Sequence, residues 1–145
     1  MHTLAVARHG AYDPVTGSLT DDGRAQVMAL ANKLELVARG RNILVAAAAS
    51  RRTHESGQII ANQLGVPLET DPFPCAAEST IPDAREYLDG HAGEKDLIVF
   101  VGHDWHVRTV PALFVPGYLA IAEDRDIAFA SSAIVDCEHR TVVII

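Results

Sequence analysis

Three apolar runs in this 145-residue sequence lead directly into side chains that can bind or attack an anion. The runs occupy residues 3–7, 43–49 and 97–101. The residues that follow them are Arg8-His9-Gly10, Ser50-Arg51-Arg52 and Gly102-His103-Asp104. Arginine presents a planar fork of donors to phosphate oxygens, and imidazole can donate a hydrogen bond or act as a nucleophile. These residue types therefore indicate a site for a phosphate-sized anion.

The three runs are expected to form strands whose ends bring those side chains together. Each run is short and nearly all apolar, without strict alternation, which is typical of parallel strands covered on both faces. The carboxyl ends of parallel strands lie at one edge of the sheet, where α/β proteins carry their ligand crevice. The helices that follow would point their N-terminal N–H groups at the same edge. Two histidines and at least two arginines can thus converge, although they are far apart in sequence.

Helical patterns separate the three runs. Thr20 is a suitable N-cap for a helix that continues to a stop signal at Gly40, and residues 52–65 predict a second helix. A shorter helix is predicted to start near Pro82. The helix after the third run is predicted to be interrupted at Pro111.

The C-terminal tail is expected to complete the sheet. Residues 127–131 predict a strand-like segment, and residues 133–145 predict a hairpin or a pair of edge strands. Residues 71–80 are the least regular part of the sequence and are expected to form a surface loop. The alternation of strands and helices predicts an α/β fold with a mainly parallel central sheet and an antiparallel C-terminal edge. The length favours a single domain, 1–145.

The composition argues against several classes of protein. A net charge of -7 disfavours a nucleic-acid partner held by general electrostatics. No apolar run approaches the roughly 18 residues of a membrane helix, and no signal peptide is visible, so we expect a cytoplasmic protein without a membrane partner. Cys75 and Cys137 do not form a C-x-x-C pair and are expected to be free thiols.

Single residues of this set have ordinary structural interpretations. One arginine or histidine at a strand end is usually a solvated loop residue, so the coincidence of three such ends is what favours a shared site. A metal site is another alternative, because His103 and His106 are three residues apart and His9 could join them. The sequence has neither an H-E-x-x-H helix nor paired cysteines, so no metal is expected.

Four further residues near the expected site have alternatives of their own. Tyr12 and Trp105 flank it, and they could form a rim that grips a partner or a ring-shaped substrate, or could pack locally. His106 is expected to face solvent or to cap a helix. Ser56 is expected to be a packing or capping residue rather than a nucleophile.

The same segments resemble the motifs of the histidine phosphatase superfamily, whose members have the phosphoglycerate-mutase-like fold. Arg-His-Gly at 8–10 resembles the family signature, and LTDDGRAQV at 19–27 resembles the segment that opens the first helix. SRRTHESGQIIA at 50–61 is similar to the second motif, and VGHD at 101–104 is similar to the strand end that carries the second family histidine. FASSAIVDC at 129–137 is similar to the last strands of the short bacterial members.

The resemblance implies a three-layer α/β/α sandwich and a role for each residue of the site. His9 would be the nucleophile that becomes phosphorylated, while Arg8, Arg52 and His103 would hold the phosphoryl oxygens. Asp104 is included among the phosphate-binding candidates. These residues supply the positive charge that a metal ion would otherwise bring, so no metal or other cofactor is implied.

Several positions differ from the family pattern. A one-residue shift of the alignment would exchange the motif arginine, Arg52, with Arg51. The serine four residues before the motif arginine, often followed by proline, is replaced here by Ala48 and Ala49, which changes the turn. Strict spacing places an alanine at the general acid of larger members. Glu78, two residues later, is the nearest substitute and is our candidate for that acid.

Too few residues separate the second motif from the third run to form a large helical lid. The chain most resembles the small bacterial phosphohistidine phosphatases, which act on a histidine of a protein domain. We therefore predict a metal-independent phosphatase whose partner is a phosphorylated protein. Two alternatives stay open. One is a phosphatase for a small phosphorylated metabolite such as a sugar phosphate or nucleotide, and the other is a non-catalytic phosphate- or protein-binding module.

Overall fold

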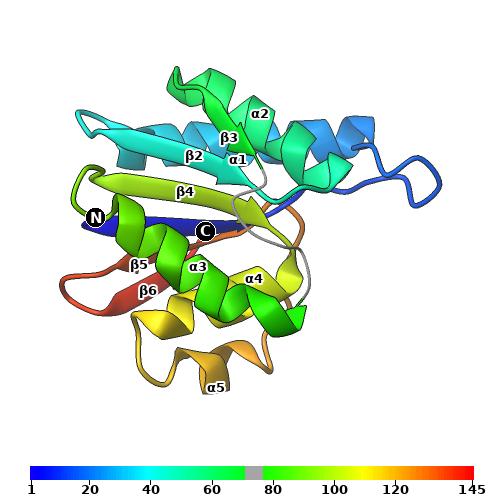
Figure 1. The fold of residues 1–145 in the computed structure, drawn as a ribbon. Helices are drawn as coiled ribbons and strands as arrows, with labels where there is room; N and C mark the ends of the chain where they lie inside the picture. The colour runs from blue at the N-terminus through cyan, green and yellow to red at the C-terminus, as the bar shows by residue number, and fades with distance from the viewer. Residues whose placement is uncertain (71–76) are drawn as a thin grey trace.

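The computed structural model describes residues 1–70 and 77–145, with the side chains of residues 77–83 left outside the description. A six-stranded sheet forms its centre, in the order β3-β2-β4-β1-β5-β6. The strands are β1 (Thr3–Arg8), β2 (Ile43–Ala47), β3 (Leu68–Thr70), β4 (Leu97–Gly102), β5 (Ser132–Asp136) and β6 (Thr141–Ile144). The first four are parallel to one another, and β5 and β6 are antiparallel, as Figure 1 shows. The predicted antiparallel C-terminal edge is confirmed.

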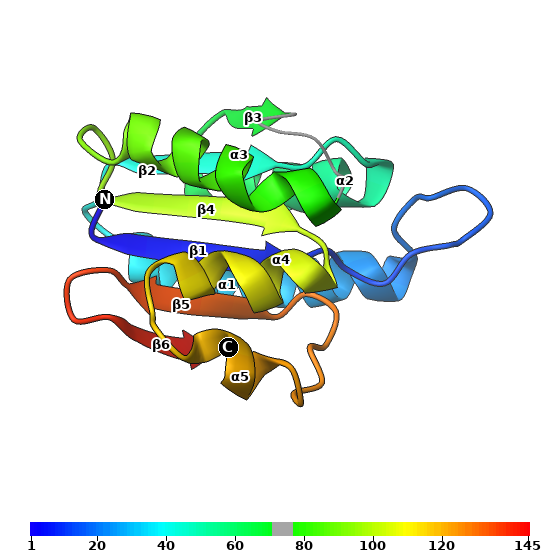
Figure 2. The same ribbon diagram turned by 60° about the horizontal axis from the view of Figure 1, so that its bottom comes forward.

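Helices cover both faces of the sheet (Figures 1 and 2). They are α1 (Asp21–Ala38), α2 (Arg51–Leu64), α3 (Ala77–His91), α4 (Asp104–Thr109) and α5 (Tyr118–Ala122), with a 3₁₀ turn η1 at Val110–Leu113. Along β1, Leu4 and Val6 pack in the same core cluster as Leu88 of α3, whereas Ala5 and Ala7 pack with the buried residues of α1 and α2. Successive side chains of a strand point to opposite faces, so β1 is buried on both, and the expected three-layer sandwich is confirmed.

The register of the parallel strands aligns the ends that matter for the site. Arg8 at the end of β1 lies opposite Gly102 at the end of β4. Ala47 at the end of β2 lies opposite Val101 of β4. The three predicted strand ends therefore lie at one edge of the sheet, where the residues that follow them meet.

The predicted N-cap of α1 and the predicted end of α2 are confirmed, and the structure adds a cap for α2 that was not predicted. Thr20 caps α1 by accepting a hydrogen bond from the Gly23 N–H at 3.0 Å, and Ser50 caps α2 by accepting from the Thr53 N–H at 3.3 Å. α2 ends at Gly65, whose φ of 71° is the left-handed conformation that favours glycine. Among the described residues no helix is both long and apolar enough to cross a membrane.

The structure differs from the sequence-based expectation in four short segments. α3 begins at residue 77 instead of near Pro82, so the expected loop at 71–80 is helical in its last four residues, and residues 71–76 lie outside the description. Residues 127–131 are not a strand, because Ala130 adopts a φ of 53° that ends any extended run. β3 and α5 were not predicted. Both are five residues or shorter and too brief for a periodic apolar pattern.

Candidate active site

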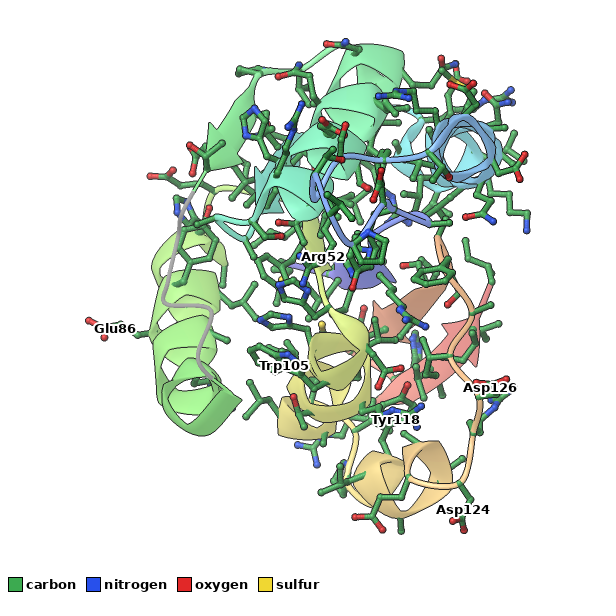
Figure 3. All side chains as sticks on the ribbon, turned by 90° about the vertical axis from the view of Figure 1, so that its right-hand side faces the viewer. Arg52, Glu86, Trp105, Tyr118, Asp124 and Asp126 are labelled. Atoms are coloured by element: carbon green, nitrogen blue, oxygen red, sulfur yellow. The ribbon has the colours of Figure 1, made fainter. Side chains whose placement is uncertain are left out.

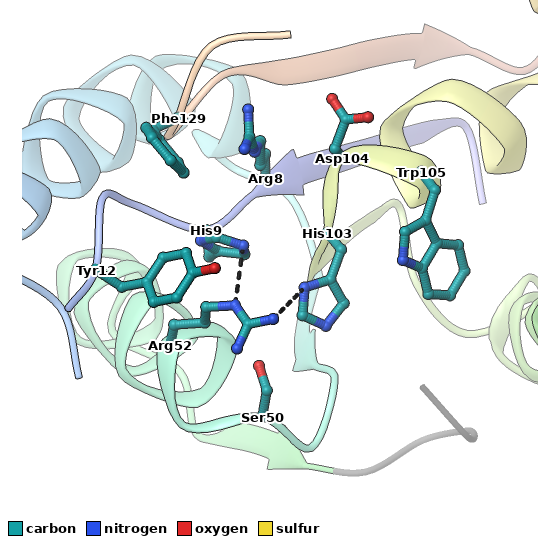
Figure 4. A pocket seen from close by; sticks show the side chains of 9 residues that line it. All are labelled: Arg8, His9, Tyr12, Ser50, Arg52, His103, Asp104, Trp105 and Phe129. Carbon is teal, nitrogen blue, oxygen red and sulfur yellow. Dashed lines mark hydrogen bonds between the residues drawn. The ribbon is translucent and has the colours of Figure 1, made fainter. Parts of the chain in front are cut away.

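His9 follows β1 and is almost completely buried, with 3% of its surface exposed. Its Nδ1 lies 2.8 Å from the carbonyl oxygen of Gly10, and because a carbonyl only accepts, Nδ1 carries the proton. On the other side of the ring, Nε2 lies 3.2 Å from Nε of Arg52, which donates to it. The imidazole is therefore held as the neutral tautomer with its Nε2 lone pair toward the pocket (Figure 4).

The surroundings of His9 favour the neutral ring. Burial lowers the pKa of His9 to about 4, and positive charge on His103, Arg52 and Arg8 acts in the same direction. The hydrogen bond to the Gly10 carbonyl acts against this shift by raising the pKa. Burial prevails because the charged ring would lose its hydration without gaining an anionic partner. At neutral pH the Nε2 lone pair is available.

The two arginines approach the pocket from opposite sides, and an aromatic ring supports each of them. Arg8 donates to the carbonyl of Ile127, and its guanidinium carbon lies 4.1 Å from the ring centroid of Phe129. The guanidinium of Arg52 lies 4.5 Å from the ring centroid of Tyr12. Cation–π contacts of this kind fix the direction of a guanidinium without using its N–H donors. The guanidinium donors that are not bonded to Ile127, His9 or His103 can therefore face an anion.

His103 completes the group from the end of β4. Nη2 of Arg52 lies 3.5 Å from its Nδ1, which accepts because the guanidinium has only donors. Burial and the charges of Arg52 and Arg8 lower the pKa of His103 to about 4. The ring of His103 lies 5.3 Å from that of His9, centroid to centroid, in an edge-to-face arrangement. Two neutral imidazoles and two guanidiniums thus face one space.

Hydrogen bonds and close packing hold the turn after β1 in place. The hydroxyl of Ser56 accepts from the Gly10 N–H at 3.1 Å and donates to the Arg52 carbonyl at 2.7 Å, so it joins this turn to α2. A methyl group on Gly10 would overlap the carbonyl oxygen of Gly23 in α1, so the turn has no space for a side chain there. Ser56 is a packing residue, as the sequence predicted.

These side chains line a cavity of about 450 Å³. Its walls are formed by Arg8, His9, Tyr12, Ser50, Arg52, His103, Asp104, Trp105 and Phe129. Tyr12 and Trp105 do belong to the rim, which was one of their two predicted interpretations. Sequence reasoning did not find Ser50 and Phe129 as pocket residues. Ser50 had a signal, because an N-cap serine between a strand end and an arginine must lie at the same edge.

Three candidates differ from the central group. Arg51 points away and pairs with Glu55 at 3.1 Å, so Arg52 is the arginine of the pocket. Asp104 lines the cavity, but its carboxylate pairs with Arg108 through bonds of 2.7 and 3.2 Å. A carboxylate cannot donate to phosphate, so its predicted part in binding would have to come from its backbone N–H. Glu78 lies in α3, but its side chain is outside the description, so its role stays a prediction.

The expectation that His106 faces solvent is wrong. Its side chain is fully buried, with none of its surface exposed. Nδ1 accepts from the His103 N–H at 2.9 Å, so the alternative interpretation, a capping residue, is the one observed. Burial lowers the pKa of His106 to about 3, which keeps this nitrogen an acceptor. Gly102 makes room for the ring, because a methyl group there would overlap His106 Nδ1.

A metal site has no support among the described residues. No group of three or more His, Cys, Asp and Glu side chains in that part of the chain is placed to hold a metal ion. The positive charge of the pocket comes from its arginines, which cannot act as metal ligands at ordinary pH.

No family model matches the sequence, and no curated protein matches it. Solved structures match the fold over most of its length. A mycobacterial glucosyl-3-phosphoglycerate phosphatase in complex with VO3 has a TM-score of 0.73 at 13% identity, over 93% of this chain and 92% of that one. The Agrobacterium tumefaciens protein assigned as the phosphohistidine phosphatase SixA has a TM-score of 0.71 at 16% identity, over 99% of this chain and 97% of that one. An Entamoeba histolytica phosphoserine phosphatase in complex with 3-phosphoglyceric acid has a TM-score of 0.70 at 14% identity, over 99% of this chain and 95% of that one.

This chain has the same fold as these three phosphatases. The agreement extends over nearly the whole of each compared chain, so the described sheet and helices correspond to the complete fold and not to one motif of it. The three proteins are named for different substrates, so a preference has to be argued from the pocket of this chain itself.

Proposed function

We propose that this protein is a metal-independent phosphatase in which His9 carries the phosphoryl group as a covalent intermediate. The observation that supports this most directly is the state of the His9 ring. Its Nδ1–H is bonded to the carbonyl of Gly10, and its Nε2 faces the pocket. A pKa of about 4 keeps Nε2 unprotonated at neutral pH. In-line attack on phosphorus needs such a lone pair beside fixed positive charge.

The reaction has two displacements. First, the Nε2 lone pair of His9 forms a bond to phosphorus while the bond to the leaving group breaks, and the leaving group departs with that electron pair and takes up a proton. Water then attacks phosphorus, the P–Nε2 bond breaks, and His9 regains its lone pair as orthophosphate leaves. Because Arg52 Nε–H is bonded to the same lone pair, substrate has to displace this bond first. The released N–H can then donate to a phosphoryl oxygen.

Arg8, Arg52 and His103 provide the charge and the donors for the phosphoryl oxygens in both displacements. Their positions are already fixed by the contacts described above. Charge that is in place before the reaction starts costs no reorganisation in the transition state, and this is usually the largest contribution in phosphoryl transfer. A metal ion is not required for that purpose.

Several acidic side chains that contribute to the net charge of -7 lie away from this centre. Figure 3 shows Arg52 in the middle of the edge, with Glu86, Asp124 and Asp126 directed away from it. A local concentration of cations inside an acidic molecule is selective for anions that reach the pocket, and it does not attract polyanions to the whole surface.

The proposed substrate is phosphohistidine on a protein. The one carboxylate among the described pocket side chains is that of Asp104, which is paired with Arg108. A positioned general acid is typically worth about 10²–10⁴-fold when an alkoxide must leave. Imidazole is a much better leaving group, so cleavage of a P–N bond depends less on such an acid. A pocket with this composition favours P–N over unactivated P–O substrates.

A phosphatase for a small phosphorylated metabolite is the second candidate. Two of the similar structures are named as phosphatases of small molecules, glucosyl-3-phosphoglycerate and phosphoserine. A cavity of about 450 Å³ is within the range that holds such ligands. Glu78 acting as a general acid would support this function, since it would provide the proton that an alkoxide needs.

The test is turnover of phosphoramidate and of p-nitrophenyl phosphate by the wild-type protein and by His9→Ala, without added metal. Quenched protein is then analysed for an acid-labile, base-stable phosphoryl group. We expect turnover and label in the wild type, both absent in His9→Ala, with phosphoramidate preferred. His54→Ala is the matched control, because His54 is an exposed histidine on α2 outside the pocket.

Each other outcome has a definite meaning. A preference for p-nitrophenyl phosphate and alkyl phosphates over phosphoramidate would favour the small-molecule phosphatase. A wild-type protein that binds phosphate but shows neither turnover nor label would be a binding module, and the proposed activity would be wrong.

A further inference from the structure

Trp105 lies beside the second histidine of the pocket. It is the second residue of α4, and its indole is inclined by only 19° to the ring of His103, with the ring centroids 6.0 Å apart. A planar group that lies parallel to the His103 ring can therefore lie nearly parallel to the indole as well. Figure 4 shows the two rings next to each other on the side of the pocket opposite Tyr12.

A neighbouring ring packs against the indole and fixes its orientation. The ring of His106 is stacked on it with centroids 3.6 Å apart and planes inclined by 26°. His106 is itself immobilised, because it is fully buried, accepts the His103 N–H at Nδ1 and meets Phe100 edge to face at 5.0 Å. Trp105 is thus oriented before any ligand arrives, and a ligand that stacks on it pays little of the usual cost of ordering a side chain.

The other two aromatic residues of the pocket have a different task. Tyr12 and Phe129 each have a guanidinium over the ring face, Arg52 and Arg8 respectively. Among the described residues no such cation contact is made by Trp105. Of the three rings, the indole is the one placed to bind a neutral planar group rather than an arginine of the protein.

We propose that Trp105 is a specificity-determining residue that stacks on a planar leaving group, so that substrates with a ring bonded directly to phosphorus or through one oxygen are preferred over acyclic ones. This inference rests on the proposed function insofar as it concerns turnover, and it narrows the substrate class to phosphoryl-imidazoles and aryl phosphates. The phosphoryl group lies in the clamp of Arg8, Arg52 and His103, and the ring extends over the indole. Aromatic pairs of this kind contribute selectivity beyond the area that they bury.

The first experiment uses non-hydrolysable probes, so it does not depend on catalysis. Phenylphosphonate and methylphosphonate carry the same anionic group, but only the first has a ring. Trp105 is the one tryptophan of the chain, so quenching of the intrinsic fluorescence reports on it directly. We expect phenylphosphonate to bind about 3- to 10-fold more tightly than methylphosphonate, with quenching specific to the phenyl compound.

Variants then locate the preference, with affinities measured by calorimetry because the fluorophore is removed. In Trp105→Leu the ratio of the affinity for phenylphosphonate to that for methylphosphonate is expected to fall to about 1. In Trp105→Phe the ratio should stay close to its wild-type value. Phe114→Leu is the matched control, since Phe114 contacts Arg85 outside the pocket and its loss should leave the ratio as in the wild type. His106→Asn, which can keep the acceptor while removing the stacked ring, should lower the ratio partly.

Equal affinities in the wild type, or an unchanged ratio in Trp105→Leu, would overturn the inference. The proposed phosphatase activity is separated from it by the turnover assay. A ring preference without any turnover would leave Trp105 as the specificity residue of a binding module, whereas turnover of phosphoramidate without a ring preference would retain the phosphatase and reject the role of Trp105.

Discussion

The two strand ends that carry histidines use the same residue type in different ways. His9, after β1, is bonded through Nδ1 to the carbonyl of its own neighbour Gly10 and exposes Nε2 to the pocket. His103, after β4, has its Nδ1 toward Arg52, and its backbone N–H is held by the buried ring of His106. Burial lowers the pKa of both rings to about 4.

Because their hydrogen-bond partners differ, two rings with the same pKa have different roles. A nucleophile needs a lone pair whose direction is fixed by the bond on its far side, and the Gly10 carbonyl supplies that bond to His9. His103 carries its proton on Nε2, because Nδ1 accepts from Arg52, so this ring is suited to donate to a phosphoryl oxygen. The pKa of a histidine therefore does not decide whether the ring acts as nucleophile or as hydrogen-bond donor. The partner of each ring nitrogen decides it.

The largest effect should separate the two histidines. We expect His9→Ala to lose about 10⁴-fold or more in kcat and all of the phosphoenzyme, since the nucleophile is gone. His103→Gln should lose about 10²–10³-fold, the usual cost of one donor to a developing charge, and should still form the phosphoenzyme. Quench-flow labelling with kcat for both variants checks this. A phosphoenzyme in His9→Ala, or none in His103→Gln, would reverse the assignment.

The pH dependence should show that both rings are neutral in the folded protein. Burial lowers the pKa of His9 from its ordinary value of 6.5 to about 4 in the folded protein, so Nε2 stays unprotonated well below pH 6.5. We expect kcat/KM to stay level from pH 8 to about 5 and to fall as the pH approaches 4. A pH–rate profile with half of the activity lost near pH 6.5 would contradict it.

The same shift has a consequence for stability with a defined sign. Between pH 6.5 and 4 the unfolded chain binds protons at His9, His103 and His106 that the folded chain does not. The free energy of unfolding should therefore have its full histidine contribution above pH 6.5 and decrease as the pH falls toward 4. Urea unfolding at pH 7 and pH 5 measures this, and equal stabilities would argue against buried neutral rings.

A smaller effect concerns the space behind His103. In Gly102→Ala the new methyl group would overlap the ring of His106, so we expect a loss of about 1–3 kcal/mol in the free energy of unfolding. Gly93→Ala is the control, because nothing lies within 4 Å of the position where its methyl group would be. Denaturant unfolding of the two variants should give clearly different midpoints. Equal midpoints would show that His106 can move away freely.

The smallest effect should come from the neighbour of the pocket arginine. Arg51 is exposed and pairs with Glu55 four residues later, a contact worth about 0.3–0.5 kcal/mol in a helix. Arg51→Ala should therefore leave kcat/KM within about twofold, whereas Arg52→Ala should lose about 10²–10³-fold. Steady-state kinetics of this pair tests the choice between adjacent arginines. A greater loss in Arg51→Ala would move the motif arginine by one residue.

Much of the framework could be predicted because its signals are local. The cap at Thr20, the apolar runs of β1, β2 and β4 and the break at Pro111 are each visible within a few residues of sequence. β3 and α5 were missed because elements this short are stabilised by their neighbours more than by their own pattern. The helix start at residue 77 was missed because the polar segment before Pro82 has no apolar periodicity.

The residues of the candidate site also divide into those with a local sequence signal and those without one. Arg8, His9 and His103 were found from their positions at strand ends. Phe129 was not found and the burial of His106 was not predicted, because a ring that supports an arginine or fills the space above a glycine has no signature in its own neighbourhood. Their partners lie on other elements, and only the packing of those elements brings them into contact.

The sequence by itself determined which strand ends carry chemistry, and it placed the Gly10 carbonyl that binds His9 Nδ1 in the next residue. Only the tertiary structure decided that Arg52 and not Arg51 enters the pocket and that Trp105 lies parallel to His103. It also decided that burial keeps the rings neutral. The reason is physical: a hydrogen bond between neighbours is local, whereas desolvation, convergence of charge and ring packing depend on segments that folding alone brings together.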